Sequence, residues 1–376
     1  MFIPFNKPYL TGKEFDNIRE AYKNSHLSGD GEFTDRCCRW LEQRTGCELA
    51  LLTHSCTAAL EMTALLVGIQ SGDEVIMPSF TFVSTANAFV TKGGVPVFVD
   101  IRSDTLNIDE TLIEDAITAK TKAIVVVHYA GVACEMDKIM DIATRHKLKV
   151  IEDAAHGVGA TYKGRPLGAI GHLGCYSFHE TKNIISGEGG ALLVNDTDLT
   201  ERAKILWQKG TNRSQFMSGQ VDKYTWVDCG SSFLMSEILA AFLWSQMMAA
   251  DEITGQRLKL WNRYHDAFES LEIDGFFRRP FVPHNCAHNA HMYYILLCDK
   301  SDRADFIEAM HKHGVGCVFH YVPLHSSPAG RRFSRSHGAL DVTNLQSERL
   351  VRLPMFFDLS EAQLNLVIES VIKLQK

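Results

Sequence analysis

Several features that identify common protein classes are missing from this chain of 376 residues. It contains no GxGxxG run after a strand-like segment and no GxxxxGK[ST] run, which argues against a nicotinamide dehydrogenase and a P-loop enzyme. The net charge of −7 argues against a duplex-DNA binder, because such proteins normally carry a basic face. The ten cysteines form no CxxC pair, which favours reduced thiols in a reducing compartment.

Signals for export or membrane insertion are missing as well. The initial run MFIPFNKPYL lacks a charged region followed by an apolar one, so we expect no signal peptide. The most apolar stretch, which begins at Ala50, contains His54 and Glu61 and is too polar to span a bilayer. We therefore expect a cytoplasmic protein that binds neither membrane nor nucleic acid.

The first 200 residues alternate strand-like and helix-like patterns. DEVIMP (73–78) and VPVFVDI (95–101) read as strands, as do TKAIVVVHYAG (121–131) and LKVIEDAA (148–155). Continuous Val and Ile runs are typical of strands buried on both faces. Strand, helix, strand at this spacing predicts an α/β fold with a parallel sheet and right-handed crossovers. The intervening helices are expected at 84–93 and 136–147.

The pattern changes after Ser236 to one long helical stretch that ends at residue 271. We expect a large domain over residues 1–240, including the N-terminal segment, and a smaller α/β domain over 241–376. The two should pack together, because no Pro/Ser-rich linker separates them. In the smaller domain, strands are expected at 292–298 and 316–322, and helices at 302–313 and 360–374.

Two charged residues fall near ends of predicted strands, where open parallel sheets bind ligands. Asp153 closes KVIED, and a buried carboxylate there is costly unless it meets a cation or hydrogen-bond donors. Its functional interpretation is an ion pair with a protonated ring nitrogen, and the alternative is a helix cap. Lys182 follows the apolar run in CYSFHETKN. It is either an ordinary solvated lysine or an amine that condenses with a carbonyl.

Further residues complete the requirements of one cofactor. Thr57 and Ala58 open the helical run SCTAALEMTALL, where free N–H groups and the helix dipole suit a phosphate. Ser177 can donate a hydroxyl to the same phosphate, and Phe82 can lie over a heteroaromatic ring. The alternatives are a plain helix cap and core packing. With Lys182 as the amine and a carboxylate for the ring nitrogen, the set matches pyridoxal phosphate.

The same residues lie in motifs that resemble the nucleotide-sugar aminotransferases of the DegT/DnrJ/EryC1/StrS family. The resemblance implies the aspartate aminotransferase fold (fold type I), pyridoxal phosphate as cofactor, and a homodimer with active sites at the interface. The motifs run in family order over nearly the whole chain: SCTAALEM, DEVIMPSFTFVSTANA, VHYAG, VIEDAAHGVGATYKGRPLG, SFHETKN, GEGG and HYVPLH.

The resemblance also implies roles for single residues. It places the covalent cofactor lysine at Lys182, the partner of the ring nitrogen at Asp153, and the ring-facing side chain at His156. It places the phosphate cup on Thr57, Ala58 and Ser177, and the stacking aromatic on Phe82.

One family motif departs from its usual form. Many relatives carry an Asn-aromatic-Arg-Met run whose asparagine reaches the neighbouring subunit's phosphate. Here GSSFLM places Ser232 and Leu234 at the asparagine and arginine positions. Asn212 or Arg213 are the candidates to replace that contact.

HETKN, KGTNRSQF and GQVDKYTW are most similar to members that make dTDP-4-amino-4,6-dideoxygalactose, for enterobacterial common antigen or lipopolysaccharide O-antigen. This implies amino transfer from L-glutamate to the 4-keto carbon of dTDP-4-dehydro-6-deoxy-D-glucose. The 4-amino gluco epimer and a 3-amino sugar stay open as products. Candidate substrate-binding residues are basic side chains for the diphosphate and residues of FHYVPLH for the sugar: Arg213, Lys223, Arg331, Arg332, His320, Tyr321 and His325.

Three other functions compete. A sugar dehydratase on this scaffold carries histidine in place of Lys182. A metal enzyme is suggested by HNCAHNAH, with His284, Cys286, His288 and His291, but that run precedes a strand and lacks an obvious carboxylate partner, so we expect no metal. A cofactor-loaded sensor lacks support from any DNA-reading module.

Overall fold

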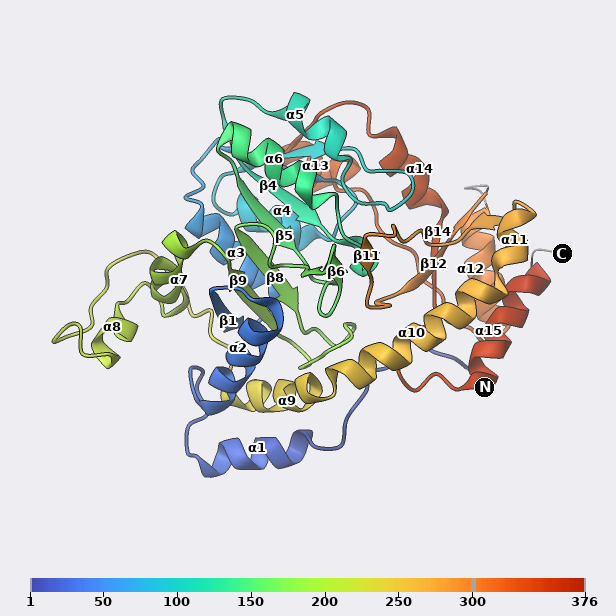
Figure 1. The fold of residues 1–376 in the computed structure, drawn as a ribbon. Coiled ribbons are helices and arrows are strands. Elements are labelled where there is room, and N and C mark those ends of the chain that lie inside the picture. Colours follow the sequence, from blue (N-terminus) through green and yellow to red (C-terminus); the bar gives the residue numbers. More distant parts are fainter. Residues whose placement is uncertain (1, 299–301, 375–376) are drawn as a thin grey trace.

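The computed structural model describes residues 2–298 and 302–374 (Figure 1). Its largest element is an eight-stranded sheet in which β1 and β8 are antiparallel to β9 and the other neighbours are parallel. The strands lie in the order β1 (Leu49–Thr53), β9 (Gly190–Val194), β8 (Leu173–Ser177), β5 (Lys149–Asp153), β4 (Thr121–Val127), β2 (Glu74–Pro78), β3 (Val95–Val99) and β13 (Arg335–Ser336).

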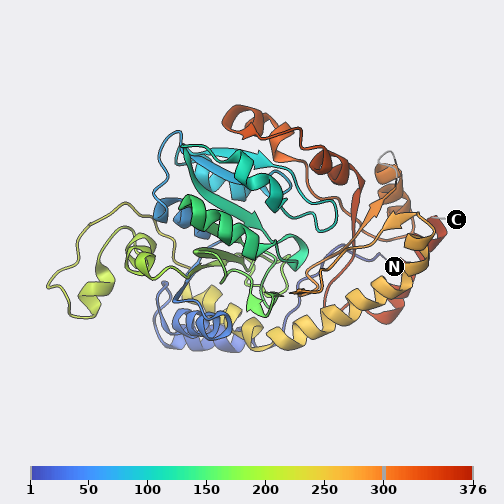
Figure 2. The ribbon, with the colours of Figure 1, turned by 45° about the horizontal axis from the view of Figure 1, so that its top comes forward.

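Helices cover both faces of this sheet (Figures 1 and 2). Because strand side chains alternate between faces, Ile76 and Ile124 join one apolar core, whereas Val75 and Val125 join the other. Both faces are therefore buried, as the continuous apolar runs predict. The first core includes α1 (Glu14–Lys23), α2 (Glu32–Thr45), α5 (Ile113–Ala116), α6 (Met136–His146) and α9 (Glu237–Met248), and the second includes α3 (Cys56–Leu66), α4 (Val83–Val90) and α7 (Thr200–Trp207).

The C-terminal part has an antiparallel sheet of its own, in the order β10 (Phe277–Arg278), β12 (Tyr293–Leu297) and β14 (Leu350–Leu353). The expected domain boundary at 240/241 lies within α9, and that division stays a prediction. No helix of the described residues is long and apolar enough to cross a membrane. The helices of this part are α10 (Ala250–Ala267), α11 (Glu269–Ile273), α12 (Asp302–Lys312), α13 (Pro328–Phe333), α14 (Asp341–Arg349) and α15 (Glu361–Leu374).

Two details differ from expectation. The strand predicted at 316–322 is wrong: only an isolated bridge forms, between Val318 and Arg352, because the following residues turn toward a cavity. The long helical stretch after Ser236 is broken at Ala249 and Phe268. The remaining short elements are β6 (Thr161–Tyr162), β7 (Arg165–Pro166), β11 (Cys286–Ala287), α8 (Arg213–Met217) and the 3-10 turns Glu110–Leu112, Tyr129–Gly131, Thr197–Leu199 and Leu324–Ser326.

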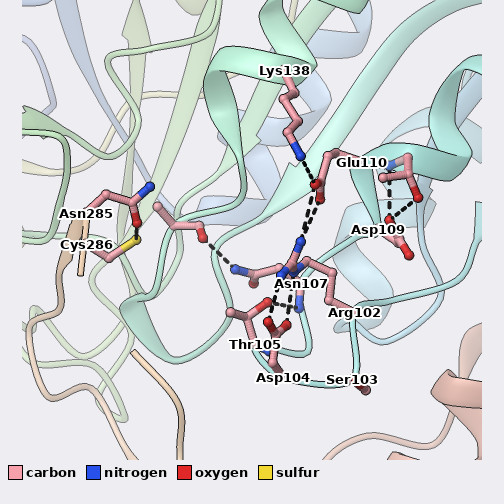
Figure 3. Close-up of polar contacts among 12 residues, drawn as sticks. Arg102, Ser103, Asp104, Thr105, Asn107, Asp109, Glu110, Lys138, Asn285 and Cys286 are labelled. Carbon is pink, nitrogen blue, oxygen red and sulfur yellow. Dashed lines mark hydrogen bonds and ion pairs between the residues drawn. The ribbon is translucent and has the colours of Figure 1, made fainter. Parts of the chain in front are cut away.

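A polar network joins the loop after β3 to the loop after β4 (Figure 3). Arg102 Nη1 lies 3.3 Å from Glu110 Oε1. The Asn107 amide donates to the carbonyls of Val132 and Ala133, and its oxygen accepts the backbone N–H of Tyr129 at 2.9 Å. This network fixes Tyr129 at the carboxyl end of β4.

Candidate active site

A cavity of about 430 Å³ opens at the carboxyl ends of the parallel strands. Asp153 is the last residue of β5, Ser177 is the last residue of β8, and Thr57 lies in the first turn of α3. The crossover connections thus bring residues from distant parts of the chain to one edge of the sheet. The predicted site residues that line the cavity are Thr57, Phe82, Asp153, His156, Ser177, Lys182, His320 and Tyr321.

The Asp153 carboxylate is buried and oriented by two donors. Thr85 donates its hydroxyl to Oδ2 at 2.7 Å, and the Ala155 N–H donates to Oδ1 at 3.2 Å. Burial raises the pKa of Asp153, while these two hydrogen bonds and the nearby Lys182 act in the opposite direction. A desolvated, oriented carboxylate of this kind suits a protonated ring nitrogen, with which it can form an ion pair.

Lys182 follows β8 in a turn, and its side chain is partly exposed because it faces the cavity. Burial of the amine lowers the pKa of Lys182 from 10.5 to about 8, and Arg352 adds to this effect. The thiol of Cys56 and the carboxylate of Asp153 partly oppose it. A substantial fraction of the amine is therefore neutral at mildly alkaline pH and able to attack a carbonyl.

His156 also lines the cavity, and its backbone carbonyl belongs to a hydrogen-bond network with Asn183, Asn289 and His291. Its ring stacks on His291, with centroids 4.2 Å apart, and its Nδ1 is buried without a partner. The Asn183 side-chain nitrogen donates to the carbonyl of Asn289, which leaves the amide oxygen as an acceptor. That oxygen accepts a hydrogen bond from His291 Nδ1 at 3.1 Å. The Asn289 amide in turn donates to the carbonyl of His156 at 2.7 Å. The network links the lysine segment to the segment that carries His156.

The first turn of α3 also lines the cavity. Within the described residues, no hydrogen bond uses the backbone N–H of Cys56 or Thr57. The Ala58 N–H is already taken by the Ser55 hydroxyl at 3.1 Å, so Ala58 offers no free backbone donor here. Free N–H groups at a helix start, with the hydroxyls of Thr57 and Ser177 beside them, are the donor set that a phosphate requires.

Phe82 lies between β2 and α4 at the rim of the cavity. Phe82 is 59% exposed, whereas most phenylalanines of a folded protein are buried. Side chains suited to cover a ring, bind a phosphate, supply an amine and pair with a ring nitrogen thus line one cavity. The residues present fit pyridoxal phosphate.

The other predicted site residues do not line this cavity. Asn212 caps α8 and accepts from the Thr225 N–H, whereas Ser232 pairs with Gln208. His325 bonds the Ser79 hydroxyl at 2.7 Å outside the cavity lining. The exposed basic candidates that do not line the cavity are Arg213, Lys223, Arg331 and Arg332.

Sequence reasoning missed Arg352, which lines the cavity, and Thr85, which hydrogen-bonds the cavity residue Asp153. Arg352 lies on β14, and its signal in the sequence is a single charge within the apolar run LVRLPM. Thr85 orients Asp153 from α4, and nothing in its local sequence distinguishes it. His291, considered above only as a metal ligand, lines the cavity.

The HNCAHNAH run is dispersed by the fold. His288 packs on Trp261, with ring centroids 4.4 Å apart, whereas His291 stacks on His156. Cys286 lies in β11. Among residues 2–298 and 302–374, no group of three or more His, Cys, Asp or Glu side chains is arranged to hold a metal ion.

Comparison with known proteins places this geometry in a family. The chain is 34% identical over 380 residues to the uncharacterised protein MJ1066 of Methanocaldococcus jannaschii, covering 99% of this chain and 97% of the relative. It is 33% identical over 379 residues to the spore coat polysaccharide biosynthesis protein SpsC of Bacillus subtilis, covering 98% and 96%.

Solved structures agree. Helicobacter pylori PseC, an aminotransferase involved in the biosynthesis of pseudoaminic acid, superposes with a TM-score of 0.91 at 26% identity and 99% coverage of both chains. This likeness confirms the aminotransferase fold that the motifs imply. The sequence profile of the DegT/DnrJ/EryC1/StrS aminotransferase family matches residues 8–372. The chain is therefore a sugar aminotransferase of the DegT/DnrJ/EryC1/StrS family, whose cofactor is pyridoxal phosphate.

Proposed function

We propose that this enzyme transfers the amino group of L-glutamate to the 4-keto carbon of dTDP-4-dehydro-6-deoxy-D-glucose, giving dTDP-4-amino-4,6-dideoxy-D-galactose. The observation that carries the chemistry is that Lys182 and Asp153 line one cavity with the start of α3, where the N–H groups of Cys56 and Thr57 have no partner among the described residues. The choice of sugar rests on the resemblance of HETKN, KGTNRSQF and GQVDKYTW to enzymes that make this product.

Each residue has a defined task in this proposal. When bound, pyridoxal phosphate holds the amino group between the two substrates, and its protonated ring withdraws electrons from the reacting carbon. Asp153 keeps the proton on the ring nitrogen. The Lys182 amine holds the resting cofactor covalently and, once displaced by the donor, removes the proton from the donor's α carbon. Phe82 and His156 confine the ring from either side.

Retention of Lys182 disfavours the dehydratase alternative, in which histidine stands at that position. A lysine amine of pKa about 8 moves protons efficiently near that pH. Amination, rather than loss of a hydroxyl, is the reaction that this side chain supports.

We also propose that the working enzyme is a homodimer. The segment between α7 and α9, which carries α8, projects from the body (Figures 1 and 2). It exposes several large apolar side chains, and exposed apolar patches mark interaction surfaces. Asn212, Arg213 and Ser232 lie in this segment, and in a dimer they are candidates to reach the neighbouring phosphate. The exposed apolar side chains are Phe216, Met217, Tyr224, Trp226 and Val227.

The test is a visible absorption spectrum of the cofactor-loaded protein. The band of the lysine-linked cofactor should disappear with L-glutamate and return with dTDP-4-dehydro-6-deoxy-D-glucose. The UDP-linked sugar serves as a comparison, and nuclear magnetic resonance of the product distinguishes C4 from C3 and galacto from gluco. Absence of the band in the wild type would refute the proposal. A band that disappears with L-glutamate but does not return with the sugar would refute only the proposed sugar substrate.

A further inference from the structure

His291 lines the active-site cavity, and hydrogen bonds fix its backbone on both sides. Its N–H donates to Asn289 Oδ1 at 3.1 Å, and its carbonyl accepts from Nη2 of Arg257 at 2.6 Å. Nε of Arg257, on α10, donates to the carbonyl of Ala290 at 3.0 Å. Ala290 has a φ of 51°, in the left-handed region, and a side chain there persists only where its surroundings hold it. The fold therefore sets the position of His291 closely, although nothing in the preceding sections gives this residue a task.

Asn183 determines which ring nitrogen of His291 carries the hydrogen. Because Asn183 Nδ2 donates to the carbonyl of Asn289 at 2.8 Å, the amide oxygen is the atom that faces His291 Nδ1 at 3.1 Å. An amide oxygen can only accept, so Nδ1 carries the hydrogen and Nε2 the lone pair. Asn183 is the residue after Lys182. The hydrogen bond from His291 thus holds the segment that carries the lysine.

The ring of His291 also supports His156. The two rings are nearly parallel, at 16°, with centroids 4.2 Å apart. Nδ1 of His156 is buried without a partner, so ring packing rather than hydrogen bonding orients this side chain. Its other aromatic neighbour, Tyr129, approaches edge-on with a centroid distance of 6.0 Å. Burial lowers the pKa of both histidines well below 6.5, so the two rings stack as neutral groups without mutual repulsion.

We propose that His291 is a positioning residue for the cofactor site, with two separate tasks. Its Nδ1–H holds Asn183 and thereby the segment of Lys182, and its ring supports His156 on the side of the cofactor ring. This inference rests on the proposed function, in which Lys182 binds the cofactor and His156 covers its ring. Reacting groups must be held to within a fraction of an ångström, which their own rotamers alone do not ensure. His291 acts through its neighbours and need not touch a substrate.

Substitutions can separate the two tasks, because they use different parts of one side chain. His291→Phe keeps a flat ring for the stack and loses the hydrogen-bond donor. His291→Gln keeps an N–H donor and loses the ring. Asn183→Ala removes the acceptor and leaves His291 in place. His313→Phe and His313→Gln, at an exposed position after α12, are the matched controls.

Three measurements on the full-length protein distinguish the tasks. Calorimetric binding of pyridoxamine phosphate depends on contacts with the ring and needs no covalent bond to Lys182. Stopped-flow absorbance follows covalent uptake of pyridoxal phosphate, which depends on the lysine. Urea titration gives the free energy of unfolding, so that a general loss of stability is recognised.

We expect His291→Phe to slow covalent uptake about tenfold, since the Asn183 oxygen loses its buried partner, and to leave pyridoxamine phosphate binding within about threefold of wild type. Asn183→Ala should reproduce this pattern, and it decides the question alone if a His291 variant does not fold. His291→Gln should show the reverse pattern: pyridoxamine phosphate binding weaker by about 3- to 10-fold, the range for loss of an aromatic pair, and covalent uptake less affected than in His291→Phe.

The two His313 variants should match the wild type in all three measurements. Parallel losses of binding and uptake in both His291 variants, in proportion to lost stability, would show a merely structural role and overturn the proposal. Values equal to those of the His313 controls would overturn it as well. Failure of the wild type to take up pyridoxal phosphate covalently would instead overturn the proposed aminotransferase function.

Discussion

At the scale of single residues, the chemistry depends on how burial changes Lys182. An ordinary lysine is protonated at neutral pH and cannot attack a carbonyl. Here burial lowers the pKa of the amine to about 8, and Arg352 acts in the same direction. The neighbouring Asp153 carboxylate acts in the opposite direction and limits the lowering of the Lys182 pKa.

This balance predicts the pH dependence of cofactor uptake. Below pH 8 the Lys182 amine of the cofactor-free protein is mainly protonated, so the rate of covalent uptake should rise with pH and level off above about 8. Arg352→Gln removes a positive charge, which should raise the Lys182 pKa and move the curve to higher pH. Stopped-flow absorbance checks this. A wild-type rate that still rises toward pH 10.5 would show that Lys182 is not perturbed.

Sequence reasoning reached the residues whose neighbours in the chain are informative. Lys182, Asp153 and Thr57 each lie in a run that resembles a family motif. Arg352 does not, because its significance arises from His320 and Phe5, which approach it only in the folded chain. A residue whose role depends on distant partners has no local signal.

At the scale of elements, the start of α3 is expected to bind the cofactor's phosphate. Ser177→Ala should weaken pyridoxal phosphate binding about tenfold or more, through loss of a hydrogen bond to a charged group. Binding of pyridoxal, which lacks the phosphate, should be unchanged. Ser218→Ala, on the exposed segment after α8, is the control. If Ser177→Ala weakened the binding of pyridoxal and of pyridoxal phosphate equally, Ser177 would not contact the phosphate.

The turn before β12 is a second element with a testable role. Asn289 is 1% exposed and joins the carbonyls of His156 and Val158 to the backbone of His291. Asn289→Ala leaves buried groups unpaired and should lower the free energy of unfolding by roughly 2–3 kcal/mol.

Asn285→Ala is the matched control for that change, because Asn285 lies in the same run and is only partly buried. It should alter the free energy of unfolding by less than about 0.5 kcal/mol in urea titrations. Equal effects of the two substitutions would mean that the network contributes nothing specific.

Strands of the large sheet were predictable because Val and Ile runs bounded by polar residues mark strands buried on both faces. The same criterion failed at 316–322, where an apolar run contributes His320 and Tyr321 to the cavity instead of extending a sheet. Breaks at Ala249 and Phe268 also lack a sequence signal, since neither glycine nor proline stands there.

At the scale of the whole molecule, dimer formation should depend on the segment around α8. Trp226 is 78% exposed, and Trp226→Glu should shift the protein toward monomer and weaken cofactor binding. Ile273→Glu, at a position 79% exposed on α11, is the control and should leave both unchanged. Sedimentation velocity reports the assembly. A wild-type monomer with full activity would refute the dimer.

The central claim is that Lys182 holds the cofactor. The most direct measurement is reduction of the cofactor-loaded protein with sodium borohydride, which fixes the cofactor on the amine that binds it, followed by peptide mass spectrometry. The account predicts one modified peptide, with the phosphopyridoxyl group on Lys182, and no modification in Lys182→Ala. A stable modification on another lysine, or none in the wild type, would contradict it.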